Sequence, residues 1–546
     1  MNGDLLLAAA LAPLAVTALA ALGAGRAVWP LFALSALPAG LAAAFPDGTA
    51  DMPAGGTLRL DPDFAPALAA AALIWAAAAV QSRDSVGGDA GERRYAVFFG
   101  LAMTGNFGLL VAGEMVAFYV GFSVMSLAVF GLVAHKGSAE ARRAAWVYIW
   151  LAVVGELALF AAILLIATAH DGTSFPTIDG TPPPEAAAWL ALIGCGIKAG
   201  LVPLHVWLPL AHPAAPAPAS AALSGAMLKA GVVGLLLLVP PSLGTPAGFG
   251  EAMVVAGLTG TFAGALYGTA QRDLKTALAY SSLSQMGLAI TALGAAYAGL
   301  APAGAAAAAL ALFAIHHGLS KGALFLGAES GLPRGATVAL MAVPALALTG
   351  FPLTSGYLSK TAFTDALGAG PLAQAITVAG FATALVMARS LRLAWSKKPS
   401  SGGWRATGFV GLVLASVALP AFWSGGPEKL LSGLAPASLA VALAPSAFAL
   451  AAGALVIRAR LATPPAPPGD ALALGRAAAG AVRPALVWGA RSLGRAAERL
   501  DALSGALAAG AARALAGRPA EPPDRWVGAG GALVATLLAA GLAVLI

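Results

Sequence analysis

The sequence predicts an all-α membrane protein that crosses the bilayer many times. Of its 546 residues, 59% are hydrophobic and only 10% are charged, and the mean hydropathy is +0.84. Water-soluble domains carry about 25% charged residues, so a soluble globular fold is excluded. Apolar runs of roughly 17–25 residues, long enough to cross a hydrocarbon core of about 30 Å, recur along the chain. A membrane β-barrel would need alternating segments of about ten residues, which the sequence lacks.

Apolar runs separated by charged, proline-rich or glycine-rich breaks predict about 16 transmembrane helices. They cover approximately residues 4–23, 27–45, 64–81, 95–112, 114–134, 145–168, 187–209, 217–239, 250–270, 275–296, 303–328, 337–368, 372–393, 406–424, 436–457 and 527–546. The first run lacks the basic start of a secretory signal and is predicted to be a spanning helix. The run at 337–368 is too long for one helix and contains GFPLTSG. A broken helix is predicted there, surrounded by protein or lining a cavity.

The positions of lysine and arginine predict the orientation. With the N-terminus outside, two of the 31 basic residues fall outside, four fall within the membrane, and the other 25 fall at cytoplasmic turns or span ends. Such one-sidedness follows the positive-inside rule. We therefore expect a multi-pass protein of the cell (inner) membrane with both termini on the outer face.

The predicted organisation has six parts. These are N-terminal helices at 1–94, a first five-helix repeat at 95–239, a second at 250–393, additional helices at 404–458, a cytoplasmic-face lateral helix at 466–525 and a final anchor at 526–546. Each five-helix set contains a helix interrupted by prolines or glycines, PLHVWLP in the first and GFPLTSG in the second. Because five is odd, the second copy would enter from the opposite side of the membrane. Inverted repeats with broken helices are typical of transporters.

The lateral helix is predicted from its amphipathic pattern. Leu486, Leu493, Leu500 and Leu507 repeat every seven residues, and the arginines lie mostly elsewhere on the helix. A helix of this kind lies in the plane of the membrane interface. The alternative is a disordered cytoplasmic tail, which the final apolar run at 527–546 disfavours because the chain must return to the membrane.

Ionisable residues inside the predicted spans are the candidate functional residues, because charge in the membrane is rare and costly. They are Glu114, Lys198, His205, His212, Lys229, His316, His317, Lys321 and Lys360, with Glu156 as a further possibility. The four-residue spacing of His317 and Lys321 predicts one helical face. Lys198 and His205, seven residues apart, are also predicted to share a face.

The chemistry of these residue types favours a proton or cation relay. A lysine in a low-dielectric site releases its proton more readily than in water, and an approaching carboxylate reverses this. Histidines and water can bridge the distance between such lysines. Structural roles remain open at some positions. A membrane histidine could serve as a hydrogen-bond partner between helices, and Glu156 as a partner in a structural ion pair. Lys360 could extend its amine to the outer membrane interface. Lys275 is predicted to lie on the cytoplasmic surface.

No cofactor or metal site is predicted. The single cysteine, Cys195, lies among apolar residues, which excludes an intrachain disulfide and a cysteine-ligated cluster. The sequence contains no CxxC, P-loop or dinucleotide fingerprint. Any redox chemistry would therefore belong to partner subunits, and no nucleic-acid partner is expected.

Three motifs resemble one family. GIKAGLVPLHVWLPLAHPAAPAPASAALSGAMLKAG, RDLKTALAYSSLSQMG and HHGLSKGALFL are similar to the antiporter-like, proton-conducting membrane subunits of respiratory complex I, hydrogenase-4-type hydrogenases and multisubunit Na⁺/H⁺ antiporters. The sequence of the first motif is most similar to that of the hydrogenase-4 large membrane subunit. The resemblance implies Glu114 as carboxylate partner, Lys198 as switching lysine and Lys229 as connector. It further implies a central relay at His317 and Lys321 and a terminal lysine at Lys360, although Thr361 stands where the family often has an acid.

We therefore expect a proton-translocating subunit of an oxidoreductase complex of the NADH:quinone or membrane-bound hydrogenase type, with no redox centre of its own. Its expected partners are other membrane subunits, the lipid bilayer and protons, with Na⁺ as an alternative ion. The alternatives are a component of a multisubunit Na⁺/H⁺ antiporter or of an inorganic-carbon uptake complex without redox coupling, and a non-conducting scaffold. The retained lysines argue against the scaffold.

Overall fold

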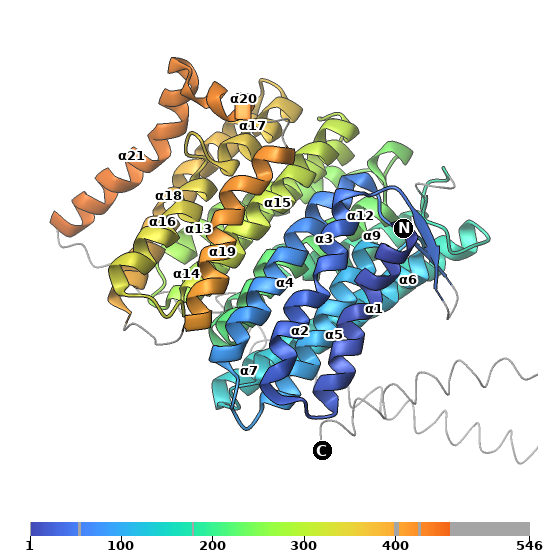
Figure 1. Cartoon of the computed structure of the whole chain (residues 1–546). Coiled ribbons are helices and arrows are strands. Elements are labelled where there is room, and N and C mark those ends of the chain that lie inside the picture. Colours follow the sequence, from blue (N-terminus) through green and yellow to red (C-terminus); the bar gives the residue numbers. More distant parts are fainter. Residues whose placement is uncertain (1, 53–55, 177–179, 398–402, 424–426, 459–546) are drawn as a thin grey trace, which may run out of the picture. The chain divides into compact units, whose positions relative to one another are not determined.

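A computed structural model describes residues 2–52, 56–176, 180–397, 403–423 and 427–458 (Figure 1). The chain divides into two units, Met1–Leu472 and Ala473–Ile546, and every described residue belongs to the first. The predicted lateral helix at 466–525, with its leucine repeat, and the predicted anchor at 526–546 lie outside the described residues.

The described part is built almost entirely of helices. They are α1 (Asn2–Ala21), α2 (Val28–Ser35), α3 (Leu37–Ala44), α4 (Ala65–Ser85), α5 (Glu92–Leu110), α6 (Met115–Ala134), α7 (Ala139–Ala169), α9 (Glu185–Ala199), α10 (Leu208–Ala214), α11 (Ala217–Ala222), α12 (Lys229–Leu238), α13 (Phe249–Thr269), α14 (Leu274–Tyr297), α15 (Ala303–Gly327), α16 (Arg334–Thr349), α17 (Ser355–Leu367), α18 (Pro371–Ser396), α19 (Gly403–Trp423), α20 (Pro427–Leu431) and α21 (Pro436–Arg458). A π-helical segment, Leu223–Met227, joins α11 to α12. Strands β1 (Thr49–Asp51) and β2 (Thr57–Arg59) form an antiparallel hairpin.

Within the described residues, ten helices are long and apolar enough to cross a membrane, or eleven if the bent pair Glu428–Leu434 and Ser438–Ala452 counts as one span. The predicted class, an all-α polytopic membrane protein, is confirmed. The predicted number of 16 is not reached by this criterion. One reason is that α14 carries a lysine, several serines and a glutamine, and yet every one of its residues is buried. Protein rather than lipid surrounds this helix.

The two ends of the helix bundle differ in character. The β1–β2 hairpin lies at one end, where Gly113 N donates to Thr57 O (2.9 Å) in the connection between α5 and α6 (Figure 1). We call this the hairpin end. The opposite end, formed by the connections at 86–91, 135–138, 270–273 and 328–333, is the basic end. There Arg26 donates to Gly87 O at 2.7 Å and Arg405 to Asp84 O at 2.6 Å.

Two stretches of the chain each contain five helical segments, one of which is broken. The first is α5, α6, α7, a broken α9/α10 pair and α11–α12, and the second is α13, α14, α15, a broken α16/α17 pair and α18. Successive members pack on one another in the same order in both sets. The breaks begin at Gly200 (φ 76°) and Gly350 (φ 86°), in a left-handed conformation that glycine adopts without strain. The predicted interruptions at PLHVWLP and GFPLTSG are confirmed.

One spacing prediction fails at the first break. Since α9 ends at Ala199, His205 lies in the irregular segment before α10 and not on the helix that carries Lys198. The predicted shared face of Lys198 and His205 is therefore wrong, because it assumed a continuous helix. The indole of Trp207 donates to Ile197 O (2.8 Å), so one carbonyl near the end of α9 is paired within the protein.

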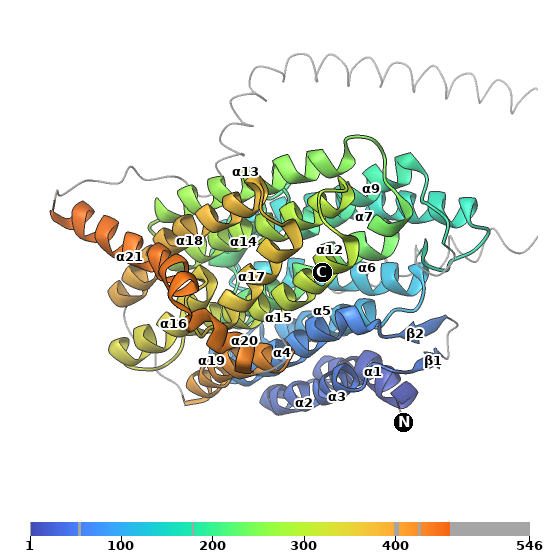
Figure 2. The same cartoon turned by 90° about the horizontal axis from the view of Figure 1, so that it is seen from above.

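Close packing places α14 at the centre of the described bundle. It contacts α10, α13, α15 and α18, and Figure 2 shows it inside the layer of α13 and α18, with α1, α2 and α3 on the far side beyond α4 and α5. A Cβ at Gly287 would lie 2.5 Å from Gly257 O. Such small residues let neighbouring membrane helices approach closely, and here they pack α14 against α13.

Candidate functional site

A first polar cluster surrounds Lys198, in the last turn of α9. Its ammonium donates to the Tyr148 hydroxyl of α7 at 3.0 Å and lies 5.5 Å from the ring centres of Phe122 and Tyr148. Lys198 is only 4% exposed. Glu156 of α7 lines the same small cavity, and its carboxylate accepts a hydrogen bond from Ser123 of α6. A buried cation and a buried carboxyl group thus share one enclosed space.

Glu114 occupies a different place. It is the N-cap residue of α6 at the hairpin end, and its carboxylate accepts from Thr173 Oγ1 at 2.9 Å. It does not line the cavity that holds Lys198. The carboxyl group that shares this cavity is Glu156, which the sequence marked only as a further possibility. The difference arises because Glu114 precedes the first residue of α6, whereas Lys198 sits well inside the bundle.

Lys229 and Lys321 bind to neighbouring residues of the π-helical segment and of α14. Lys229, at the start of α12, donates to Ser224 O at 2.7 Å in the π-helical segment. The Ser224 hydroxyl lies 2.7 Å from that of Ser282 in α14, and Ser282 donates to Leu278 O at 3.0 Å. Lys321 of α15 donates to the same Leu278 carbonyl at 2.9 Å. The Lys229 amine is therefore held by the Ser224 carbonyl and the Lys321 amine by the Leu278 carbonyl, with the Ser224–Ser282 hydroxyl pair between these two carbonyls.

Lys321 makes a second contact to α14, with the hydroxyl of Ser281. It is completely buried, and Lys229 is 4% exposed. The π-helical segment beside them is a rare conformation that occurs often at functional sites. Because both amines lie inside the bundle, the hydroxyls and carbonyls of α14 and of the π-helical segment take the place that water has around an exposed lysine.

The two neighbouring histidines of α15 point to different partners. His316 Nδ1 lies 2.8 Å from the Ser355 hydroxyl, which opens α17 directly after the second break. The His317 ring stacks on Phe313, with ring centres 4.8 Å apart, one helical turn from Lys321. Helix α15 therefore contacts α14 through Lys321 and contacts the second broken helix through His316.

Lys360 of α17 folds back onto the second break. Its ammonium donates to Thr349 O, the last residue of α16, at 2.6 Å. It lines a cavity of about 350 Å³ among α16, α17, α18 and α21. Hydroxyl groups dominate the polar lining, from Thr349, Tyr357, Thr361, Thr364, Thr377 and Ser438. Space and polar groups for several water molecules are present here.

The remaining two histidines lie along the first broken helix. His205 is buried in the break itself. His212 of α10 is fully buried and stacks on Phe325 of α15, with ring centres 4.3 Å apart. It lies within electrostatic range of both Lys275 and Lys321. His212 is therefore the histidine placed between the basic end and the central lysines.

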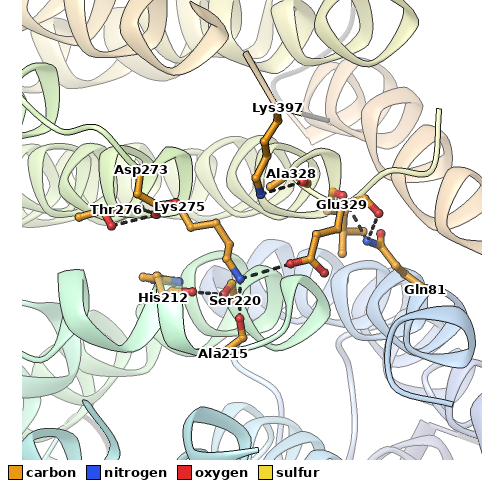
Figure 3. A network of polar contacts seen from close by, with 11 residues as sticks. Gln81, His212, Ala215, Ser220, Asp273, Lys275, Thr276, Ala328, Glu329 and Lys397 are labelled. Carbon is orange, nitrogen blue, oxygen red and sulfur yellow. Dashed lines mark hydrogen bonds and ion pairs between the residues drawn. The ribbon is translucent and has the colours of Figure 1, made fainter. Parts of the chain in front are cut away.

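A polar network closes the basic end (Figure 3). Lys275, in the first turn of α14, donates to Ala215 O between α10 and α11 and pairs with the Glu329 carboxylate at 3.5 Å. Gln81 of α4 donates to Glu329 O at 3.1 Å, and Lys397 donates to Ala328 O at 3.2 Å. Lys275 is only 3% exposed. The predicted surface position of Lys275 is wrong, because the segment after α15 folds over it.

The positive charges in this network lower the pKa of the Glu329 carboxyl group. Burial alone would raise the pKa of the Glu329 carboxyl, but the ammonium groups of Lys275, Lys136 and Lys397 hold that pKa below its ordinary value of 4.5. The ionised form is thus favoured in the folded protein. Its contribution to stability is full above pH 4.5 and is lost as the pH falls through the lowered folded-state pKa.

Replacing Glu329 with glutamine is expected to reduce the free energy of unfolding by about 1–3 kcal/mol at neutral pH, between the values for exposed and fully buried ion pairs. Lys275 would keep its burial and lose its counter-charge. Thermal unfolding of the detergent-solubilised protein between pH 3.5 and 7 measures this. The wild type should lose stability at the acidic end more steeply than the variant. The exposed Glu428→Gln serves as control, and equal melting curves for wild type and Glu329→Gln would contradict a stabilising pair.

Several residues of the site were not predicted from the sequence. They are Ser123, Tyr148, Ser224, Ser281, Ser282 and Glu329. Serine and tyrosine carry no charge, so they do not stand out in an apolar helix. A signal did exist for α14: the run YSSLSQ places several polar side chains in a helix that is otherwise apolar, which is unfavourable in lipid unless neighbouring helices cover them.

Fold and site together define a polytopic helical membrane protein with buried lysines, histidines and serines joined across its centre. Residues 112–386, slightly more than half of the 546, match the family described as NADH:quinone oxidoreductase/Mrp antiporter, TM. The chain belongs to this family of membrane proteins. The resemblance seen in its three motifs is therefore confirmed.

Individual relatives agree with this membership. The chain is 32% identical over 291 residues to hydrogenase-4 component B of Escherichia coli, which covers 48% of this chain and 43% of that protein. It is 31% identical over 291 residues to NAD(P)H-quinone oxidoreductase chain 4 of Synechococcus elongatus, covering 47% and 52%. The chain thus spans about half the length of the curated relatives it matches. A solved Mrp complex from Dietzia sp. shares the fold, with a TM-score of 0.67, 23% identity, and 100% and 66% coverage.

Proposed function

We propose that this chain is a proton-translocating, antiporter-like subunit of a multisubunit membrane complex, and that it moves protons along the buried lysines and histidines. The Ser224–Ser282 hydroxyl pair, which lies between the carbonyls that hold the Lys229 and Lys321 amines, carries the proposal, and water would complete the proton path between the hydroxyls and the amines. Amines buried inside a membrane protein are energetically costly, and their presence there therefore indicates a functional role. Alternate protonation of the two lysines would pass charge from the first five-helix set to the second.

The other residues extend this path in both directions. On one side, Lys198 and Glu156 share a cavity in which a proton could be exchanged between amine and carboxylate. On the other side, His317 and His316 lead toward Ser355, the second break and Lys360 with its hydroxyl-lined cavity. The matched packing order of the two five-helix sets supports an inverted repeat. His205, His212 and Glu114 are assigned to the approaches from the two membrane faces.

The partners are proposed from the family. Component B belongs to a hydrogenase, and chain 4 to a quinone oxidoreductase, so we place this chain beside redox subunits in an inner-membrane complex, with its N-terminus outside. The second candidate is a cation/proton antiporter without redox coupling. It is favoured by the Mrp complex as structural neighbour and by 34% identity over 300 residues to a probable K⁺/H⁺ antiporter component of Rhizobium meliloti. A component of an inorganic-carbon uptake complex is the alternative within this class without redox coupling.

The proposal is tested in vesicles that contain the complex purified with its native partners. A pH-sensitive dye should report proton movement when the complex is driven by an electron donor, or by a Na⁺ gradient if no redox subunit co-purifies. Lys321→Ala should lower the rate by about 10²-fold, in the range typical of single proton-transfer groups. The control Lys429→Ala removes an exposed amine and should leave the rate unchanged. Full proton movement in an assembled Lys321→Ala complex would refute the path.

A further inference from the structure

A cavity of about 290 Å³ runs alongside α12 and ends at Lys229. One face of α12 lines it, with Lys229, Val232, Val233, Leu236 and Leu237 following one another at helical spacing. A corresponding face of α15 lies opposite. The start of α4 closes the third side. Ser224, Ser282 and Lys321 do not line this cavity, so it is separate from the contacts toward Lys321.

The accessible residues of the lining become less exposed with depth in this cavity. At the hairpin end its lining includes Asp63, Ser242 and Gly304, which are exposed. Farther in come Leu236, Ala307 and Ala311, which are partly exposed. At the floor Lys229, Phe313 and Ala314 are buried. The cavity is therefore open at the hairpin end and closed at the level of Lys229.

The polar groups sit at its two ends. Asp61 and Asp63 flank the mouth, and the Asp61 carboxylate accepts from Asp63 N at 2.9 Å, which fixes the turn before α4. Lys229 is at the floor, and its amine donates to Ser224 O just beyond the lining. Next to it, Phe313 stacks on His317 and so separates the cavity from that histidine. An acidic mouth raises the local concentration of cations through its field, and a volume of about 290 Å³ is large enough for several water molecules between the two polar ends.

From this geometry we infer that the cavity is a water-filled access route between the hairpin-end face of the membrane and Lys229, and that Phe313 closes it off from the central histidines. The inference deepens the proposed function, because the use of the route assumes that Lys229 exchanges protons. With the hairpin end outside, Lys229 would communicate directly with the outer aqueous phase. The first five-helix set would then have its own outer connection, independent of the Lys360 cavity.

Cysteine labelling tests this route without measuring transport. The chain has one cysteine, Cys195, which is buried, so Cys195→Ala provides a cysteine-free background. Single cysteines are introduced at Ser242, Leu236, Ala307 and Ala311, and at Leu414 of α19 as a control. Leu414 is 65% exposed on an apolar helix outside the cavity. The complex in right-side-out vesicles is treated with a charged, membrane-impermeant methanethiosulfonate, and the mass of this chain reports the modification.

We expect cysteines at 242, 236, 307 and 311 to react, with the three deeper positions at least about tenfold faster than position 414, because the reactive thiolate forms only in contact with water. Reaction of the deep positions with lipid-soluble N-ethylmaleimide but not with the charged reagent would mean that an acyl chain fills the cavity and would overturn the inference. Labelling only in inverted vesicles would overturn the outer assignment. Since labelling reads access alone, it can succeed even if Lys321→Ala leaves proton movement intact.

Discussion

Lys229→Arg is expected to abolish proton translocation as completely as Lys229→Ala, with a loss of about 10²-fold or more. Arginine keeps a positive charge next to the Ser224 carbonyl, but its guanidinium does not release a proton in proteins. Lysine can release one when it is buried. The variant therefore separates two roles for the residue at the start of α12, that of a fixed charge and that of a group which loads and unloads a proton.

The measurement is the dye response of vesicles that contain the assembled complex. Lys429→Arg, on the exposed surface of α20, is the matched control and should retain the wild-type rate. Lys229→Gln provides a neutral variant with smaller volume, so a packing defect of the larger arginine can be recognised from assembly and melting temperature. If Lys229→Arg pumped normally, Lys229 would act only through its charge, and the relay through Ser224 and Ser282 would have to be abandoned.

The fold class and the breaks could be predicted because both leave local signals. Charged residues are visible against apolar runs, so Lys198, Lys229 and Lys321 were found without coordinates. Glycine and proline mark the ends of α9 and α16. The effect of a break on later residues is harder to predict, as His205 shows. Because α9 ends at Ala199, helical spacing no longer relates a residue before the break to one after it.

The burial of a residue depends on distant parts of the chain, and for this reason the remaining site residues could not be predicted from the sequence. Lys275 follows Arg272 and Asp273 and resembles a residue at the surface end of a helix. It is buried because Glu329, more than fifty residues later, folds over it. The serines of α14 gain their meaning only from lysines on α12 and α15. The polar run YSSLSQ indicates that other helices cover α14, but it does not indicate which residues of those helices contact it.

Exchange of the residues at positions 123 and 156 tests the carboxylate that accompanies Lys198. Glu156→Gln is expected to lower the proton translocation rate by about 10²-fold, because an amide cannot take up the proton that Lys198 releases. The Ser123 hydroxyl already touches the Glu156 carboxylate from the opposite helix. A glutamate side chain at 123 would therefore deliver its carboxyl group to nearly the same point of the cavity.

The double variant Ser123→Glu/Glu156→Ala moves the carboxylate from α7 to α6 and roughly conserves side-chain volume, which cores tolerate best. It should restore a substantial part of the rate that Glu156→Ala alone loses. Glu114→Gln, at the hairpin end, should have a smaller effect than Glu156→Gln, since Glu114 does not line the cavity of Lys198. The reverse order, with Glu114→Gln inactive and Glu156→Gln active, would show that proximity to Lys198 in this structure does not identify its functional carboxylate. A rescued double variant would instead show that the position of the carboxyl group in the cavity matters and the helix that supplies it does not.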